Sequence, residues 1–404
     1  MFVGLGVTGC IAAYKAVELI RTLRKRGCEV QVVATPHALE FVTRLTFETI
    51  SGQPLLADPF QRDLSWEVEH VSLARKADVL CVAPATANIL AKFARGIADD
   101  FLSTLYLATL KPVVVAPAMN FAMWAHPATR ENVGILRSRG VRVVDPSRGQ
   151  LACGEEGEGR LADPGRIAEA VFAAATPGTL AGKTVMITAG PTAEDLDPIR
   201  FITNRSTGTM GFALARIAAR RGARVILVAG PTTHEPDFEC DLVSVRSAAD
   251  MAEAVENLRN EFDIGVFAAA VADYTPESPC PEKIKKTEGS LGLQLVRTRD
   301  ILAHTCALRR GGQVLVGFAA ETADEVAEAR RKLSAKGADL MVANRVGPGS
   351  GFGAVPSAVT LVHPDGTERV LEPTDKDRVA GAILDEAWRI YAHHNARMED
   401  TRPL

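Results

Sequence analysis

The sequence FVGLGVTGCIAAYKAVELI, residues 2–20, predicts the fold of the first half of the chain. It opens with an apolar, strand-like run that ends at Thr8, and apolar residues recur with helical spacing from about Ile11. A strand that passes through a small polar turn into a helix is typical of a doubly wound α/β sheet. Unpaired N–H groups at the start of such a helix favour an anion, so Thr8, Gly9 and Cys10 are expected to form a phosphate site.

Apolar runs of the same kind continue through both halves of the chain. The predicted strands cover residues 29–35, 77–86, 111–120 and 142–146 in the first half, and 184–190, 224–232, 264–274, 313–322 and 339–345 in the second. The predicted helices cover about 11–26, 210–221, 248–260, 323–336 and 375–393. Because the strands are apolar throughout, helices are expected on both faces of each sheet.

Two tandem domains are expected from this pattern. The segment AAATPGTLAGK, residues 173–183, contains small residues, proline and glycine, which predicts a linker. The runs VTLV (359–362) and RVLE (369–372) predict an antiparallel hairpin. We therefore expect an α/β protein with two tandem doubly wound (Rossmann-like or flavodoxin-like) parallel-sheet domains, residues 1–178 and 179–404, the second with an antiparallel edge.

Composition excludes several classes of function. With 404 residues, 47% of them hydrophobic, the chain can bury large cores, and a net charge of −3 argues against nucleic acid as a partner. The sequence begins without the basic region of a signal peptide, and its apolar runs are too short to predict a membrane span. Seven cysteines without a CxxC pair indicate a reduced, cytoplasmic protein.

The opening glycines have the spacing of a dinucleotide fingerprint but not its context. Gly4, Gly6 and Gly9, with Glu29 twenty residues later, match G-x-G-x-x-G followed by an acid. However, Gly4 and Gly6 are expected inside the strand, and the end of the next strand carries Thr35 in place of a ribose-binding acid. A nicotinamide cofactor is therefore disfavoured.

Three polar residues in the first half are candidates for proton chemistry. His70 opens HVSLARKAD, Asn120 closes PAMN, and Cys153 lies in ACGEEGEGRL. An imidazole, an amide and a thiol could converge on one pocket as base, orienter and acid. Each also has a structural interpretation, as a helix cap, a turn former and a small buried thiol. The polar, glycine-rich GEEGEGR (154–160) predicts a mobile flap around the thiol.

Motifs in both halves resemble known enzyme families. The first half contains GVTGCIAAYKA, HVSLARKADVLCVAPATAN, ADDFLST, APAMNFAMW and ACGEEGEGRL, and resembles the flavin-dependent cysteine decarboxylases. The second half contains ITAGPT, LDPIRFITNRSTGTMG, AAAVADY, EKIKK, GFAAET and MVANR, and resembles phosphopantothenate–cysteine ligase. Together they are similar to the bifunctional phosphopantothenoylcysteine decarboxylase / phosphopantothenate–cysteine ligase family of coenzyme A biosynthesis.

The resemblance implies FMN in the first domain. It places His70, Asn120 and Cys153 in catalytic positions and Met123 beside the substrate. The residues that it assigns to FMN are Thr8, Gly9, Cys10, Thr35, Thr86, Asn88 and Ala118, with Ser103 nearby. The family commonly has glycine where this chain has Cys10, so a side chain is present at the phosphate turn.

The chemistry explains why a flavin is expected. Loss of carbon dioxide from a cysteine carboxylate leaves a carbanion that no amino-acid side chain can delocalise. In the family, oxidation of the thiol-bearing carbon by FMN precedes decarboxylation, and the product is an enethiolate. The resemblance then makes Cys153 the proton donor, so Cys153→Ser is expected to keep flavin and decarboxylation but accumulate the enethiol.

The second domain is expected to form an amide with a nucleotide. No P-loop motif occurs, but Ser206, Thr207 and Gly208 precede a helix and provide an anion site. The resemblance implies CTP with Mg²⁺, an acyl-cytidylate gripped by Asn204, and Lys283 beside the phosphates. It assigns to the nucleotide site Phe267, Ala268, Ala269, Asp273, Asp300, Phe318, Lys332 and Lys336.

One departure affects this domain. The family commonly has SSGKMG where this chain has STGTMG, so Thr209 stands in place of a lysine. Lys332 and Lys336 are one helical turn apart and could reach one ligand together. No residue is assigned as a metal ligand.

Three classes of function are compared. The first is the bifunctional FMN and CTP enzyme, acting on 4'-phosphopantothenate, L-cysteine and CTP. The second is a nicotinamide dehydrogenase of two Rossmann domains, and the third is a non-catalytic regulatory flavoprotein, which the presence of His70, Asn120 and Cys153 together disfavours. The resemblance also implies homo-oligomers, with trimers of the flavin domain and dimers of the ligase domain that combine into a dodecamer.

Overall fold

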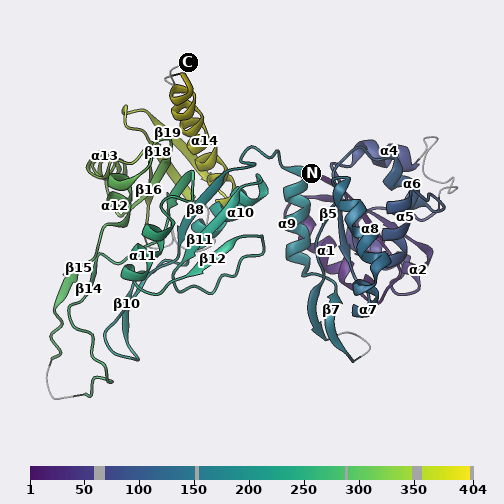
Figure 1. Ribbon diagram of the computed structural model, residues 1–404, viewed down its shortest axis with the longest axis horizontal. Helices are drawn as coiled ribbons and strands as arrows, with labels where there is room; N and C mark the ends of the chain where they lie inside the picture. Colours follow the sequence, from purple (N-terminus) through teal and green to yellow (C-terminus); the bar gives the residue numbers. More distant parts are fainter. Residues whose placement is uncertain (59–68, 151–153, 287–289, 348–356, 401–404) are drawn as a thin grey trace. The chain divides into compact units, whose positions relative to one another are not determined.

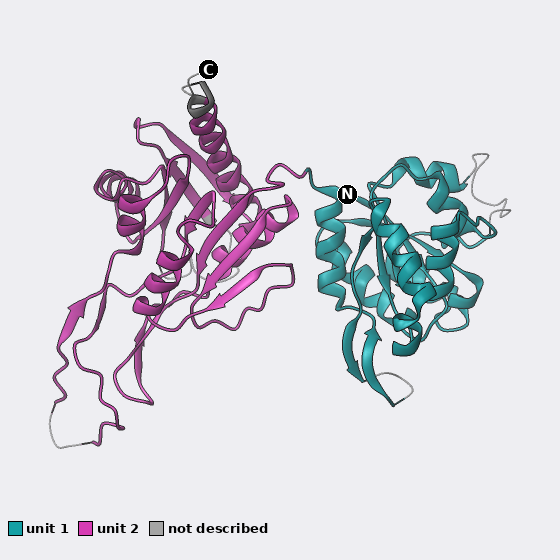
Figure 2. Cartoon of the chain, viewed as in Figure 1, with its two compact units in different colours: residues 1–177 teal, residues 178–404 magenta. Residues whose placement is uncertain are grey.

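The computed structural model describes residues 1–58, 69–150, 154–286, 290–347 and 357–400. The chain divides into two compact units, Met1–Pro177 (unit 1) and Gly178–Leu404 (unit 2) (Figure 2). In each unit, helices cover both faces of a sheet (Figure 1). The predicted α/β class with two doubly wound sheets is confirmed. Among the helices described, none combines the length and apolar character needed to cross a membrane.

Unit 1 contains a parallel sheet with the strand order β2-β1-β3-β4-β5. Its strands are β1 Phe2–Val7, β2 Glu29–Ala34, β3 Val79–Ala85, β4 Val113–Pro117 and β5 Arg142–Val143. A separate antiparallel hairpin pairs β6 Ser147–Gln150 with β7 Glu156–Arg160. The helices are α1 Ala13–Lys25, α2 Pro36–Leu39, α3 Arg44–Ser51, α4 Glu69–Lys76, α5 Ala87–Arg95, α6 Phe101–Ala108, α7 Phe121–Ala125, α8 Pro127–Ser138 and α9 Pro164–Ala175. The strand order is flavodoxin-like, with the chain changing direction between β1 and β3.

Strand β1 separates the two apolar layers of unit 1. Val3, Leu5 and Val7 are fully buried in the layer that includes α1, α3 and α9. Gly6 lies in β1 and its missing side chain makes room for Leu102 of α6, since a Cβ there would lie 2.6 Å from Leu102 Cδ1. Packing therefore accounts for this glycine of the G-x-G-x-x-G spacing, in agreement with the prediction that Gly4 and Gly6 lie inside the strand.

Unit 2 contains a mixed sheet with the order β12-β11-β8-β13-β16-β17-β18-β19. Its strands are β8 Thr184–Ala189, β11 Arg224–Ala229, β12 Asp241–Ser244, β13 Ile264–Phe267, β16 Val314–Glu321, β17 Leu340–Arg345, β18 Ser357–Val362 and β19 Glu368–Thr374. The helices are α10 Thr209–Arg220, α11 Ala248–Leu258, α12 Ile301–Leu308, α13 Glu325–Lys336 and α14 Lys376–Asp400. The parallel part has the Rossmann order 3-2-1-4-5-6, and the predicted antiparallel edge is confirmed by β18 and β19.

Short ribbons extend from the loops of unit 2 and were not predicted. They pair β9 Ala193–Asp195 with β10 Phe201–Thr203, and β14 Tyr274–Pro276 with β15 Leu295–Arg297. The predicted strand over 264–274 is wrong in its second half, because β13 ends at Phe267 and the following alanines form a loop. Alanine has little preference for strands, and this loop follows the carboxyl end of the sheet.

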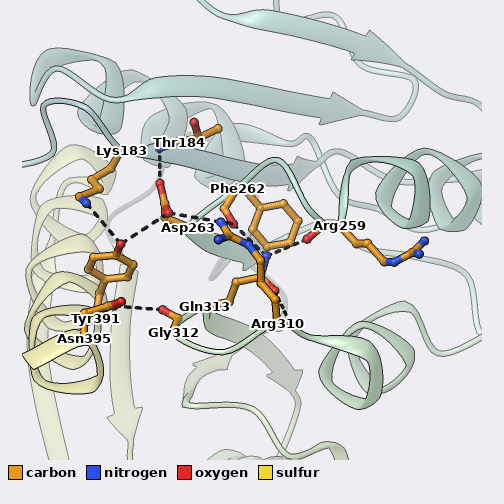
Figure 3. Close-up of polar contacts among 10 residues, drawn as sticks. All are labelled: Lys183, Thr184, Arg259, Phe262, Asp263, Arg310, Gly312, Gln313, Tyr391 and Asn395. Atoms are coloured by element: carbon orange, nitrogen blue, oxygen red, sulfur yellow. Dashed lines mark hydrogen bonds and ion pairs between the residues drawn. The ribbon is translucent and has the colours of Figure 1, made fainter. Parts of the chain in front are cut away.

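A polar network fixes the amino ends of the central strands in unit 2 (Figure 3). The carboxylate of Asp263, which precedes β13, accepts from the N–H of Thr184 in β8 at 2.9 Å and from Arg310 at 3.3 Å. Tyr391 of α14 donates its hydroxyl to the same carboxylate at 3.5 Å. Gln313, buried before β16, donates to two backbone carbonyl groups at 2.7 and 2.8 Å. The network holds the sheet at the end opposite its functional loops.

Candidate functional site

A cavity of about 1110 Å³ lies at the carboxyl ends of the central strands of unit 1. The loops after β1, β2, β3 and β4 contribute to it, together with α1 and the β6–β7 hairpin. Ligands of doubly wound sheets bind at this edge, where the strand order reverses. Among the predicted site residues, it is lined by Thr8, Gly9, Cys10, Thr35, Thr86, Asn88, Ala118, Asn120 and Met123.

Thr8 fixes two of these loops to each other. Its buried hydroxyl donates to the carbonyl oxygen of Pro84 at 2.7 Å and accepts from the N–H of Thr86 at 3.0 Å. Thr86 in turn caps α5. The hydroxyl of Thr8 is therefore used inside the protein, and Thr8 organises the turn that faces the cavity.

The turn after β1 approaches the start of α2 closely. A Cβ on Gly9 would lie 2.4 Å from the Cβ of His37 and 2.8 Å from its backbone carbon, so only glycine fits. Thr35 begins α2 without a hydrogen bond from its own side chain to the helix. Backbone groups of the turn and the hydroxyl of Thr35 are thus both available at one end of the cavity.

Cys10 adds no negative charge to this turn. Burial raises the pKa of the Cys10 thiol, and the backbone groups of Ala12 and Ala13 only partly oppose this effect. The side chain is therefore a neutral thiol near pH 7. The departure from the glycine that is common in the family leaves the turn able to accept an anion.

Asn120 contacts both α7 and the β6–β7 hairpin. Its Oδ1 accepts from the N–H of Ala122 at 2.8 Å and caps the helix, while its Nδ2 donates to Glu155 Oε2 at 3.3 Å. On the hairpin, the carbonyl oxygen of Gly159 accepts from the N–H of Met119 at 3.0 Å. The amide is thereby fixed at the wall of the cavity.

The prediction of a mobile flap over 154–160 is wrong for the part that forms β7. A Cβ on Gly159 would lie 2.2 Å from the carbonyl oxygen of Met119, and one on Gly157 would lie 2.7 Å from Phe121 Cβ. Gly159 allows the strand to pack against the backbone of the loop of Asn120, and Gly157 makes room for the side chain of Phe121. These glycines serve close packing. A glycine-rich sequence is compatible with either close packing or mobility, so the sequence alone did not tell them apart.

Two predicted residues of unit 1 that the structure describes, His70 and Ser103, do not line the cavity. His70 is the second residue of α4, and its ring packs edge-on against Phe101 with centroids 6.1 Å apart. Ser103 is fully buried and forms a capping box with Asp100 at the start of α6. Cys153 lies outside the described residues. The predicted meeting of imidazole, amide and thiol stays a prediction, because the described residues include His70 and Asn120 but not Cys153.

In unit 2, Asn204 joins the loops that follow β8 and β13. Its Nδ2 donates to the carbonyl oxygens of Ala270 and Val271 at 3.0 and 3.2 Å. The hydroxyl of Thr188, at the end of β8, accepts from the N–H of Ala269 at 3.2 Å. These loops leave the sheet at its switch point, where nucleotides bind in Rossmann folds.

The start of α10 completes this edge. Gly208 has a φ of +79° and begins the helix, and Ser206 Oγ accepts from its N–H at 3.2 Å. A Cβ on Gly211 would lie 2.5 Å from Ala189 Cβ, so the helix packs tightly against the end of β8. The turn before α10 has the geometry expected of an amino-terminal anion site, and binding of an anion there stays a prediction.

The predicted lysines of unit 2 have separate partners. Lys332 Nζ lies 2.6 Å from Glu321 Oε1, and Lys336 Nζ lies 2.9 Å from Asp300 Oδ2. Asp300 also caps α12. Each lysine is thus paired with a carboxylate in the protein, and their common ligand stays a prediction. Lys283 is exposed.

The remaining predicted residues lie on strand ends and loops of the same unit. Phe267 ends β13 and is buried, with Ala268 and Ala269 directly after it. Phe318 packs against the core shared by α10 and α14. Asp273 is exposed, and its carbonyl oxygen accepts from the N–H of Thr298 at 3.0 Å.

Sequence reasoning missed Asp197, which anchors the segment EKIKK, residues 282–286, through a hydrogen bond to its backbone. Its buried carboxylate accepts from the N–H groups of Ile199, Arg200 and Ile284 at 2.8, 2.8 and 3.1 Å. Burial opposes ionisation, but these donors outweigh it and keep the pKa of Asp197 below its ordinary value. Asp197 lies in the motif LDPIRF, residues 196–201, where an aspartate before proline is equally typical of an exposed turn, so the sequence alone does not show that it is buried.

No group of three or more histidine, cysteine, aspartate or glutamate side chains is placed to hold a metal ion within the ranges described above.

Comparison with known proteins gives the class of the chain. Residues 2–176 match the flavoprotein family model, and residues 180–390 match the model of the DNA/pantothenate metabolism flavoprotein C-terminal domain. The chain is 46% identical over 387 residues to the coenzyme A biosynthesis bifunctional protein CoaBC of Bacillus subtilis, covering 95% of each protein. It is 43% identical over 397 residues to CoaBC of Mycobacterium tuberculosis, covering 94% of each.

A solved structure is also similar. The C-terminal domain of a CoaBC protein is 37% identical, with a TM-score of 0.46, and the match covers 54% of this chain and 99% of that one. Fold, site and relatives together define a two-domain flavoprotein enzyme. The chain belongs to the family of coenzyme A biosynthesis bifunctional proteins. The expected decarboxylase and ligase activities of coenzyme A biosynthesis are confirmed by this membership.

Proposed function

We propose that unit 2 ligates 4'-phosphopantothenate to L-cysteine with CTP, and that unit 1 decarboxylates the product to 4'-phosphopantetheine with FMN. The assignment of each activity to a unit is supported by the two family models, which divide the chain at the same place as its contacts. The cavity at the β1–β3 switch point carries the proposal for unit 1.

The residues of this cavity fit FMN. Gly9 permits the close approach of the turn to α2, the thiol of Cys10 is neutral, and Thr35 offers a hydroxyl. These groups would hold the phosphate, and Thr86, Asn88 and Ala118 would lie along the rest of the cofactor. Bound FMN supplies the oxidation of the thiol-bearing carbon that makes loss of carbon dioxide feasible.

The protein groups then orient the substrate and move protons. Asn120 is held at the cavity wall by Ala122 and Glu155, so its amide would bind the substrate carboxylate or amide in a fixed orientation. Met123, half exposed, would pack beside the substrate. Cys153 remains the proposed proton donor to the product carbon, and His70 the proposed base.

Assembly would bring His70 into the site. Its ring packs on Phe101 and is not part of the cavity wall in a single chain, whereas Ile11, Tyr14 and Met123 are exposed apolar side chains in that wall. Exposed apolar surface of this kind marks contact sites. We propose trimers of unit 1, in which a second copy contributes His70, and dimers of unit 2, combining into a dodecamer.

In unit 2 the switch-point loops would bind the nucleotide. The N–H groups at the start of α10 and the lysines Lys283, Lys332 and Lys336 would neutralise the phosphates, with Mg²⁺ carried by the triphosphate. Asn204 would contact the acyl-cytidylate while it ties the two loops together. The cytoplasm is the proposed compartment, because the described cysteines are free thiols.

Product analysis of the full chain tests these assignments. With 4'-phosphopantothenate, cysteine and CTP, we expect release of pyrophosphate and carbon dioxide and a yellow protein. With 4'-phosphopantothenoylcysteine alone, carbon dioxide should be released without CTP. In the Cys153→Ser variant the flavin and carbon dioxide release should remain while the enethiol accumulates. Colourless protein that still releases carbon dioxide would exclude the flavin.

A further inference from the structure

Two cations in the unit 1 cavity are not used by the residues proposed to hold the cofactor. Lys15 on α1 and Arg160 at the end of β7 both line the cavity. Burial lowers the pKa of Lys15, and the positive charge of Arg160 lowers it further, against opposing effects of Glu18 and Asp163. Both positive charges therefore face the same cavity.

Neither cation forms an ion pair with a carboxylate of the described residues. The carboxylate of Asp163 instead accepts from the N–H of Gly165 at 2.8 Å and caps α9. By contrast, Lys92, another cation of the lining, lies 2.6 Å from Asp99 and 2.8 Å from Asp100. The charge of Lys92 is thus neutralised by two carboxylates, whereas Lys15 and Arg160 contribute positive charge to the cavity.

The hairpin presents Arg160 openly. A Cβ on Gly149 of β6 would lie 3.5 Å from a guanidinium nitrogen of Arg160, so the guanidinium lies across a residue that has no side chain. A guanidinium with free donors binds phosphate oxygens two at a time, and a lysine beside it adds a point charge.

This pair is distinct from the phosphate turn of the cofactor. Lys15 lies on α1, five residues after Cys10, and Arg160 ends β7 of the hairpin, so neither belongs to the turn after β1. The cavity of about 1110 Å³ exceeds the roughly 300–1,000 Å³ of ordinary ligand pockets, which leaves room for a second ligand beside a cofactor.

We propose that Lys15 and Arg160 bind the phosphomonoester group of the substrate decarboxylated in unit 1. The proposal rests on the function proposed above, in which that substrate carries a 4'-phosphate. The same chemistry could come from the phosphate of FMN, so the experiment must separate the two sources.

The test compares two substrates on the full chain, 4'-phosphopantothenoylcysteine and its dephosphorylated form, pantothenoylcysteine. In Arg160→Gln and Lys15→Met, kcat/KM for the phosphorylated substrate should fall by roughly 10- to 100-fold, as expected for the loss of a charge-assisted hydrogen bond. The value for pantothenoylcysteine and the flavin content should stay within about twofold of the wild type, and Arg160→Lys should recover part of the loss.

Matched controls exist on the same elements. Arg148→Gln removes an exposed arginine of β6 that does not line the cavity, and Lys25→Met removes a lysine from the far end of α1. Both should leave both substrates unaffected. Ligase activity of each preparation reports folding of the chain. If the dephosphorylated substrate reacts too slowly, inhibition by 4'-phosphopantetheine and by pantetheine replaces the comparison, and only the former should weaken.

Three results would overturn the proposal. Equal losses on both substrates would assign the cations to the reacting end of the substrate. Loss of flavin would assign them to the cofactor. If neither variant changed the ratio of kcat/KM for the two substrates, Lys15 and Arg160 would have no role in binding the phosphate. A wild-type protein that decarboxylates neither substrate would instead contradict the proposed function itself.

Discussion

The hydroxyl of Thr209 lies 3.2 Å from Nε2 of His234, so the loop after β11 is fastened to the first residue of α10. Thr209 also contacts Thr207 Oγ1 at 2.7 Å, and Thr232 Oγ1 donates to the carbonyl oxygen of Thr207 at 3.0 Å. The position where the family commonly has a lysine therefore holds a hydrogen-bonded hydroxyl that orders the proposed phosphate loop.

Removing His234 is expected to loosen that loop. His234→Ala should raise the KM for CTP about 2- to 10-fold with little change in decarboxylation, because a neutral hydrogen bond of this kind contributes on the order of 1 kcal/mol. Ligase rates at varied CTP measure the effect. An unchanged KM would show that the contact does not order the loop.

The opposite change is expected from Thr209→Lys. It restores a cation at the start of α10, where the triphosphate is proposed to bind, and should lower the KM for CTP in a manner that salt weakens. The matched control is Thr179→Lys, which adds the same charge at an exposed position before β8. Equal effects of the two variants would indicate a general electrostatic attraction.

Gly159→Ala should disturb the decarboxylase alone. The added methyl group would meet the carbonyl oxygen of Met119, and overpacking of this kind costs about 1–3 kcal/mol. We expect a lower melting temperature of unit 1 and a lower rate of decarboxylation with normal ligase activity. Gly134→Ala, in a helix with open space around it, should instead stabilise by about 0.5–1 kcal/mol. Equal stability of both variants would contradict the packing argument.

Thr8→Val tests the tie between the loops after β1 and β3. It leaves the N–H of Thr86 without its partner, which costs about 1–3 kcal/mol for a buried group, and removes one of two donors to the carbonyl oxygen of Pro84, whose other donor is the N–H of residue 8. Flavin affinity should fall with it. Thr22→Val removes only a hydroxyl that donates to the carbonyl oxygen of Glu18 within α1 and should change stability by less than about 0.5 kcal/mol. Chemical denaturation and flavin titration measure both.

The Asp197 carboxylate predicts a pH dependence. Its folded-state pKa is below the ordinary value of about 4, so its contribution to stability is complete above that pH and is lost as pH falls through the folded pKa. The melting temperature of the wild type should exceed that of Asp197→Asn at pH 7, and the difference should shrink below about pH 4. A constant difference from pH 7 to pH 3 would contradict this assignment.

The regular part of the fold could be predicted because its strands are long apolar runs and its helices are amphipathic. Helix α1 was expected over about 11–26 and covers Ala13–Lys25. By contrast, β12 is a short strand of mostly exposed residues, Asp241–Ser244, and the paired ribbons of unit 2 have three residues to a strand. Such segments carry too few residues for a periodic pattern to emerge.

The site was predicted best where it depends on backbone turns. Gly9, Thr35 and Asn120 follow strands whose carboxyl ends meet, so their convergence follows from the topology. His70 lies at the start of helix α4 instead, which contributes no residue to the lining of the cavity, and the topology of the sheet does not place its side chain. Arg160 is one exposed arginine among many in the sequence, and only pairing of β7 with β6 brings it into the lining.

The contact between Gly159 and Met119 has a consequence for genetics. Gly159 has no functional group, yet in a loss-of-function screen it would be as intolerant of substitution as Asn120, whose loop it packs against. Any substitution there adds a side chain to a space already filled by the carbonyl oxygen of Met119. Intolerance to substitution in this hairpin would thus reveal the shape of the backbone as much as the location of the chemistry.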